Sequence, residues 1–213
     1  MRWAVLMVTL WASAACSGTD DKKRSQDSED TEQSTMDTGS TEDTAPPITT
    51  TPITTPETTD TGTPPLQICI NEFMADNISS LQDETGEHPD WIELHNPGDQ
   101  DVELDGWSIT DDASDPTKVL LSAELVVPAG GFLVLFADGR PDLGPEHLDF
   151  GLDSSGESVG LYRGDERGAV VNFGQLDADL AAARSSDCCA GDCWEYVRIG
   201  TPGTTNADAP YPQ

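Results

Sequence analysis

The sequence predicts an all-β domain that follows a long extension of different composition. Between Asp90 and Asp112, apolar and polar residues alternate in short runs, which is the period of a β-strand. Turn-forming residues separate these runs, and the segment has no helical period. Residues 17–66 are mainly Thr, Ser, Pro, Asp and Glu. Such a composition cannot bury enough apolar surface to offset the entropy of ordering it.

The clearest strand is predicted from Trp91 to Asn96. Ile92 and Leu94 lie on one face of this strand, and the polar residues between them predict a second face that is not buried. Residues 96–99, with the sequence Asn-Pro-Gly-Asp, predict a turn, because proline fixes φ and glycine and asparagine tolerate positive φ.

A second alternation, at Val102 and Leu104, changes phase by one residue when it continues at Trp107 and Ile109. A slip of one residue would turn every side chain to the wrong face unless a turn or bulge absorbs it. Asp105-Gly106 is suited to that bend. We therefore predict a strand, a bend and a further strand.

A further strand is predicted at Phe132–Ala137, where six apolar residues are continuous. Such a run indicates a strand that is buried on both faces or central in its sheet, rather than a ligand groove.

Several motifs, in this order and spacing, resemble the lamin-tail domain as it occurs in bacterial secreted proteins. The resemblance extends from near Gln67 to Ala207 and implies an immunoglobulin-like β-sandwich. One departure is the segment Ser185 to Asp192, where a cysteine cluster replaces a short polar loop. The matching residues are Ile70–Asn77, Asp90–Leu94 with Asn96-Pro97-Gly98, Leu104–Asp111, Val127–Phe132, Gly156–Val159 with Leu161-Tyr162, Arg184, Trp194, and Thr201-Pro202-Gly203 with Asn206.

The N-terminus resembles a bacterial lipoprotein signal. Arg2 precedes an apolar run, Trp3–Trp11, which is too short to span a bilayer, and small residues lead to Cys16. We expect cleavage to leave Cys16 as the lipidated first residue, although an ordinary secretory signal cut near Ala15 is the alternative. Lipid chains on Cys16 would then anchor the protein to a membrane. Because serine follows this cysteine, we expect an outer-membrane lipoprotein that faces the periplasm or the cell surface.

Four parts of the chain are expected. Residues 1–15 are a signal peptide, and residues 16–66 carry the lipid and form a disordered acidic linker, extended by its prolines and charges. Residues 67–207 form the β-sandwich, and residues 208–213 are a tail.

The remaining cysteines, Cys69, Cys188, Cys189 and Cys193, predict two disulfides, because an even number in an exported protein favours pairing. A bridge between the adjacent Cys188 and Cys189 would be strained. Cys69 is therefore expected to pair with Cys188 or Cys189, while Cys193 takes the other. A zinc site is less favoured, because the Cys-x3-Cys spacing occurs only once.

Charge argues against a nucleic-acid partner. The chain has a net charge of −30, and residues 67–213 hold 29 Asp and Glu against 6 Lys and Arg, a net of −23. Binding to phosphates requires clustered basic residues. The six basic residues of the domain are scattered, at Lys118, Arg140, Arg163, Arg167, Arg184 and Arg198.

Two motifs suggest chemistry that their context does not support. Ser158 lies in a Gly-x-Ser-x-Gly match, but a nucleophile elbow needs a helix after the serine, and the residues that follow predict a strand. The segment Asp101–Asp112 resembles a calcium loop only in part, and no helices flank it. We therefore expect no catalytic residues.

A calcium site built from turns is the alternative to a domain without cofactors, because calcium prefers six to eight oxygen ligands. Its candidate residues are Asp76, Asp83, Glu84, Asp90, Asp111, Asp112 and Asp115. The leading functional prediction is a membrane-anchored, non-enzymatic module that binds an envelope or extracellular protein or glycan, or has a structural role in the envelope. A calcium-dependent adhesion domain is the alternative, and a hydrolase is less favoured. The loops Asn77–Pro89 and Ala183–Trp194 are the candidate binding loops.

Overall fold

The computed structural model describes residues 67–208, so the predicted signal peptide, Cys16 and the linker lie outside the described residues. In the described part, twelve β-strands and one 3-10 helix follow one another, and no helix is long and apolar enough to cross a membrane. The elements are β1 (Cys69–Met74), β2 (Asp90–His95), β3 (Val102–Glu103), β4 (Trp107–Thr110), β5 (Val119–Leu120), β6 (Val126–Val127), β7 (Phe132–Ala137), β8 (His147–Leu148), β9 (Ser158–Arg163), β10 (Glu166–Asn172), β11 (Leu180–Arg184), β12 (Trp194–Arg198) and η1 (Asn206–Asp208).

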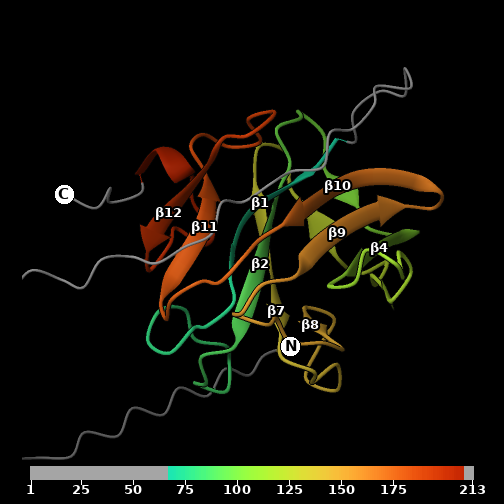
Figure 1. Cartoon of the computed structure of the whole chain (residues 1–213). Helices are drawn as coiled ribbons and strands as arrows, with labels where there is room; N and C mark the ends of the chain where they lie inside the picture. Colours follow the sequence, from blue (N-terminus) through green and yellow to red (C-terminus); the bar gives the residue numbers. More distant parts are fainter. Residues whose placement is uncertain (1–66, 209–213) are drawn as a thin grey trace, which may run out of the picture. The chain divides into compact units, whose positions relative to one another are not determined.

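The strands form a β-sandwich, which confirms the predicted fold class. One sheet has six strands in the order β12-β11-β1-β2-β7-β8, and the second has four in the order β10-β9-β4-β5. A small third sheet pairs β3 with β6. All neighbours are antiparallel except β7 and β8, and Figure 1 shows β9 and β10 beside β4, to one side of β1 and β2.

The core lies between the two larger sheets. Phe73, Ile92 and Leu94 of the six-stranded sheet belong to one buried cluster with Trp107 and Leu161 of the four-stranded sheet. Each of these side chains is at most 1% exposed. Burying one large apolar side chain contributes about 1.5–3 kcal/mol, so this cluster is the main source of the domain's stability.

The bend predicted at Asp105-Gly106 is confirmed. Gly106 has a φ of 76°, a conformation that side chains other than glycine rarely adopt. The chain leaves the small sheet after β3 and enters the four-stranded sheet at Trp107. The change of apolar phase in the sequence therefore marks the passage from one sheet to another.

The prediction that β2 has only one buried face is wrong. Residues 91–95 are all buried, and Glu93 is 0% exposed. On the outer face, Trp91 packs with Met74 and Val197 in a second buried cluster. The backbone after β12 also covers this face, because a Cβ built on Gly200 would lie 3.0 Å from the Trp91 ring.

The strand predicted at Phe132–Ala137 is present as β7, but its burial is less complete than the sequence suggests. Only Leu135 and Ala137 are fully buried, and the other four residues are half-buried. The reason is its position next to β8, which has two residues and covers only one end of β7.

Candidate functional site

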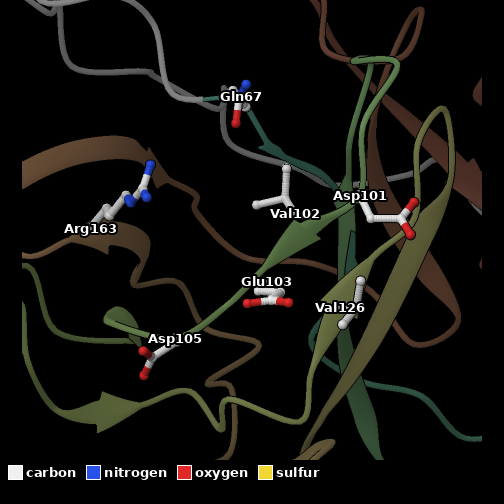
Figure 2. A pocket seen from close by; sticks show the side chains of 7 residues that line it. All are labelled: Gln67, Asp101, Val102, Glu103, Asp105, Val126 and Arg163. Atoms are coloured by element: carbon white, nitrogen blue, oxygen red, sulfur yellow. The ribbon is translucent and has the colours of Figure 1, made fainter.

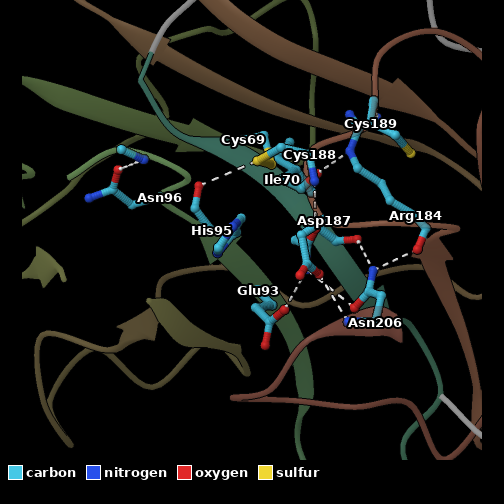
Figure 3. The surroundings of a disulfide bond; sticks show 12 residues. Cys69, Ile70, Glu93, His95, Asn96, Arg184, Asp187, Cys188, Cys189 and Asn206 are labelled. Carbon is cyan, nitrogen blue, oxygen red and sulfur yellow. Dashed lines mark hydrogen bonds between the residues drawn. A yellow bond between two sulfur atoms is a disulfide. The ribbon is translucent and has the colours of Figure 1, made fainter. Parts of the chain in front are cut away.

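A β-bulge in β1 places Asn71 within a network of buried and half-buried polar side chains. Ile70 pairs with Leu94 and Glu72 pairs with Glu93, so Asn71 is the extra residue between them. The Asn71 side chain donates through Nδ2 to Glu93 (2.9 Å), to Asp187 (3.1 Å) and to Asn206. Its Oδ1 accepts the backbone N–H of Cys188 at 3.1 Å. Figure 3 shows how this network joins β1 and β2 to the cysteine loop and the C-terminal segment.

Beside the bulge, two buried carboxyl groups lie next to each other across β1 and β2. The Thr201 N–H donates to Glu72 at 3.0 Å, and the Gly203 N–H donates to Glu93 at 2.6 Å. Burial raises the pKa of Glu72 to about 7 and that of Glu93 to about 8, although these hydrogen bonds act in the opposite direction. The pair therefore retains a proton near neutral pH and fixes the C-terminal segment on the sheet.

Two disulfides lie close to this network. Cys69 is bonded to Cys188 across a separation of 119 residues, and Cys189 is bonded to Cys193. This is one of the two pairings that the sequence left open, and it joins the start of β1 to the loop after β11. The described cysteines are thus held in disulfides rather than in the alternative zinc site.

A second polar cluster lies at the opposite end of β1. The Arg140 guanidinium binds Asp83 at 2.8 Å and Asp138 at 3.0 Å. The His147 ring contacts Asp138 through Nδ1 (2.8 Å) and Glu84 through Nε2 (3.1 Å). Burial acts to lower the pKa of His147, but the hydrogen bonds to Asp138 and Glu84 outweigh it and raise that pKa.

This cluster contains the one arrangement of described residues that could supply three ligand atoms to a metal ion. Asp83, Asp138 and His147 offer ligand atoms within 4.8 Å of one another. Both carboxylates already bind Arg140, however, so a metal ion would have to displace that guanidinium. The geometry therefore indicates an ion-pair network that joins the 77–89 loop to the residues around β8.

The seven calcium candidates do not come together as one ligand set. Asp83 and Glu84 belong to the ion-pair network, and Asp90 accepts the Asn77 N–H at 3.1 Å. Asp76 acts electrostatically on Asp90, and the other three carboxylates lie in the turn after β4. There Asp111 binds Lys118, Asp112 accepts from Ser114 and Asp115 accepts from Thr117. Asp138 and His147 were not selected from the sequence, because their approach depends on the pairing of β7 with β8.

The two loops predicted to bind a partner lie at opposite ends of β1 and cannot form one site. The loop Asn77–Pro89 follows the last residue of β1, whereas Cys188 in the loop Ala183–Trp194 is bonded to the first residue. Ile78 is 64% exposed at the former end, beside Asp179. Each loop must therefore be considered separately.

A hollow of about 490 Å³ lies beside β3 and was not predicted from the sequence. Its lining includes Asp101, Glu103 and Asp105, which are exposed and alternate with the buried Val102 and Leu104. Figure 2 shows Arg163 on one side of the hollow and Asp101 with Val126 on the other, with Glu103 between them. The remaining lining residues are Gln67 and Val102. Three carboxylates and one guanidinium thus line one accessible surface, and Asp101 Oδ1 also accepts the Ala129 N–H at 2.9 Å. The spacing of the carboxylates by two residues in the sequence was the available signal.

The serine of the Gly-x-Ser-x-Gly match lies at the first position of β9. The Ser158 hydroxyl accepts the Ala113 N–H at 3.1 Å and donates to the Asp111 carbonyl at 3.2 Å. The chain continues as a strand up to Arg163, as predicted, so the strand-turn-helix geometry of a nucleophile elbow is not formed.

Comparison with known families agrees with this architecture. The family model of the lamin tail domain matches residues 61–176. The chain belongs to the lamin tail domain family. The matched stretch of the lamin tail domain includes the hollow beside β3 and ends before β11, although β11 lies inside the six-stranded sheet between β12 and β1. No curated protein matches the chain.

Proposed function

We propose that this protein is an exported, lipid-anchored protein whose lamin tail domain is a non-catalytic binding module. Its partner is a positively charged, extended segment of an envelope or extracellular protein. The observation that supports this proposal is the hollow beside β3, where three exposed carboxylates line one accessible surface. The net charge of −23 of residues 67–213 adds a field that attracts a basic partner and speeds encounter.

The form of the hollow favours an extended segment. Asp101, Glu103 and Asp105 recur at every second residue around β3, which itself comprises Val102 and Glu103, and side chains two positions apart in an extended chain lie on the same side. A basic segment in an extended conformation has the same period, so alternate Lys or Arg residues could meet successive carboxylates. Val126, which is 36% exposed, adds apolar surface at the edge of the hollow.

The geometry favours this hollow over the calcium-dependent alternative. The carboxylates of Asp83 and Asp138 are both paired with Arg140, and Asp111 is paired with Lys118. In the hollow, only Arg163 opposes the carboxylates, and its guanidinium lies over the Trp107 ring at 5.6 Å.

The proposed binding is tested by neutralising the three carboxylates. The triple variant Asp101→Asn, Glu103→Gln, Asp105→Asn should bind a peptide of alternating lysine and serine at least tenfold more weakly than the wild type, measured by isothermal titration calorimetry. Exposed ion pairs contribute about 0.2–1 kcal/mol each, so three of them account for a change of this size. Raised salt should weaken the wild-type complex and change the binding of the variant much less.

A matched control keeps the same change of net charge. The variant Asp115→Asn, Asp142→Asn, Asp149→Asn removes three exposed carboxylates outside the lining of the hollow. It should bind the peptide within about twofold to threefold of the wild type, as expected for a weak long-range contribution. Equal weakening in both triple variants would show that the peptide responds to net charge alone, and would contradict a site at β3.

The proposed anchor rests on the sequence around Cys16, which follows an apolar run and small residues. The variant Cys16→Ser should move the protein from the membrane fraction to the soluble fraction of the cell, because no acyl chains would then insert into the bilayer. Fractionation followed by immunoblotting measures this change. Retention of the Cys16→Ser variant in the membrane fraction would contradict the lipid anchor.

A further inference from the structure

Arg184 is a buried cation without a carboxylate partner. It is 8% exposed, and no ion pair joins it to a carboxylate of the described residues. Its Nε donates to the Ile70 carbonyl at 2.8 Å, and its guanidinium lies 4.5 Å from the centre of the Trp194 ring. Burial lowers the pKa of Arg184, because a desolvated charge is costly when no opposite charge lies nearby.

The sulfur of Cys193 lies beside this guanidinium. Arg184 Nη1 is 3.5 Å from Cys193 Sγ, and the same group donates to the Cys189 carbonyl. Figure 3 shows the Arg184 side chain extending toward Ile70 and Cys189. An adjacent arginine stabilises a thiolate, and a more stable thiolate leaves a disulfide faster. Reduction would therefore supply the anion that Arg184 lacks.

We propose that Cys189–Cys193 is a site of reversible thiol–disulfide exchange, which an external dithiol reduces in preference to Cys69–Cys188, with Cys193 leaving as a thiolate paired with Arg184. The reductant is a protein or small-molecule dithiol. The residues enclosed by the bond, Ala190, Gly191 and Asp192, are exposed, so the reductant can approach this loop.

The exchange takes place in two steps. A thiolate of the dithiol attacks Cys189 Sγ, so that a bond forms between these sulfurs while the Cys189–Cys193 bond breaks and Cys193 receives the electron pair. The second thiol of the reductant then loses its proton and attacks the reductant sulfur that is bonded to Cys189. This forms the disulfide of the reductant and releases Cys189 as a thiolate. The reductant becomes a disulfide, the protein gains two electrons, one proton protonates Cys189 and the other enters the solvent.

The Cys69–Cys188 disulfide differs from Cys189–Cys193 in its neighbouring groups and in the length of the loop that it closes. The contacts of the Cys69–Cys188 bond are with the Asn71 network and the His95 carbonyl rather than with a guanidinium. It also joins residues 119 positions apart, whereas Cys189 and Cys193 are separated by four. Breaking the short loop releases little chain entropy and leaves the long one closed. The domain can therefore be reduced at one site while it stays folded.

The test equilibrates the full chain in buffers with graded ratios of reduced to oxidised dithiothreitol, followed by alkylation and peptide mass spectrometry. Cys189–Cys193 should be half-reduced at a ratio at least tenfold lower than that for Cys69–Cys188, which is about 30 mV for a two-electron couple. At dithiothreitol ratios that fully reduce the Cys189–Cys193 bond, Cys193 should also be alkylated at a lower pH than Cys189. Reduction of both disulfides at the same ratio, or alkylation of Cys193 with the pH profile of an ordinary cysteine, would overturn the proposal.

Two variants separate the charge of Arg184 from its structural contacts. Arg184→Lys should keep the preference for Cys189–Cys193, and Arg184→Gln should reduce it to less than threefold. The exposed arginine of β12 gives the matched control, Arg198→Gln, which should behave as the wild type. If Arg184→Gln disturbs the fold, the alkylation profile of the wild-type protein still decides the outcome. An unchanged preference in a folded Arg184→Gln variant would contradict the role of the guanidinium.

Discussion

Removing the Cys69–Cys188 bond is expected to lower the free energy of unfolding by about 5 kcal/mol in the chain-entropy description of disulfides. The double variant Cys69→Ser, Cys188→Ser frees a loop whose ends are 119 residues apart. It also loosens the backbone N–H of Cys188, which donates to the bulge residue Asn71. Because whole domains are stable by only about 5–15 kcal/mol, this variant should be close to unfolded at 37 °C.

Urea denaturation of the full chain under oxidising conditions, followed by tryptophan fluorescence, measures this loss. The control variant Cys189→Ser, Cys193→Ser opens a separation of only four residues and should lose about 2 kcal/mol. An equal loss in the two double variants would show that loop length does not govern their effect. It would also contradict the role of Cys69–Cys188 as the principal covalent link between the cysteine loop and the start of β1.

The second large effect is on the pH dependence of stability, because the folded domain binds protons at Glu72 and Glu93 that the unfolded chain releases. Burial raises these pKa values from 4.5 to about 7 and about 8. The stabilisation from binding these protons is complete below the unfolded pKa and is lost as the pH rises through the folded values. We expect the unfolding free energy to fall by about 3–5 kcal/mol between pH 5 and pH 8.5, since the two carboxyl groups interact and their shifts do not add.

Other groups limit the stable range from both sides. The raised pKa values of Asp90, Glu157 and His147 act in the same direction as the glutamate pair. Hydrogen bonds hold the pKa values of Asp179 and Asp187 below their usual range despite burial, so their contribution is lost as the pH falls through those values. Stability should therefore be greatest near pH 5.

The double variant Glu72→Gln, Glu93→Gln separates this mechanism from general repulsion on an acidic surface. It should be slightly less stable than the wild type at pH 5, because each amide donates where a carboxyl oxygen accepts, and it should lose most of the pH dependence. A control with the same charge change, Asp165→Asn, Glu166→Gln, removes two exposed carboxylates. If the melting temperature of the control variant loses as much of its pH dependence as that of the Glu72→Gln, Glu93→Gln variant, the buried carboxyl groups are not the source of the pH dependence.

The strands between Val102 and Thr110 could be predicted because their burial follows the local sequence pattern. The alternation of Val102 and Leu104, and the change of phase before Trp107, depend on neighbouring residues and on Gly106. The sequence held a similar signal for Asn71. Ile70 and Phe73 are separated by three residues, whereas apolar residues on one face of a regular strand are separated by two or four. That break marks the bulge.

The burial of Glu72 and Glu93 could not be predicted from such local patterns. A carboxylate between apolar residues of a strand indicates a solvated face. Here, however, Thr201 and Gly203, which are more than 100 residues further along the chain, cover the face that carries Glu72 and Glu93. The cluster around His147 has the same difficulty, because Glu84, Asp138 and His147 come together only through tertiary pairing. For the disulfides, the sequence disfavoured a bridge between adjacent cysteines but could not choose between the two remaining pairings.

The hollow beside β3 is tested most directly by a nuclear magnetic resonance titration of the ¹⁵N-labelled protein with the alternating lysine–serine peptide. The amide signals of Gln67, Val102, Glu103 and Val126 should shift progressively with added peptide, while those of Leu120 and Leu143, exposed elsewhere on the domain, stay in place. The shifts should disappear at high salt. Shifts concentrated around Asp83 and Asp138, or no shifts at millimolar peptide, would contradict a binding site for a basic segment at β3.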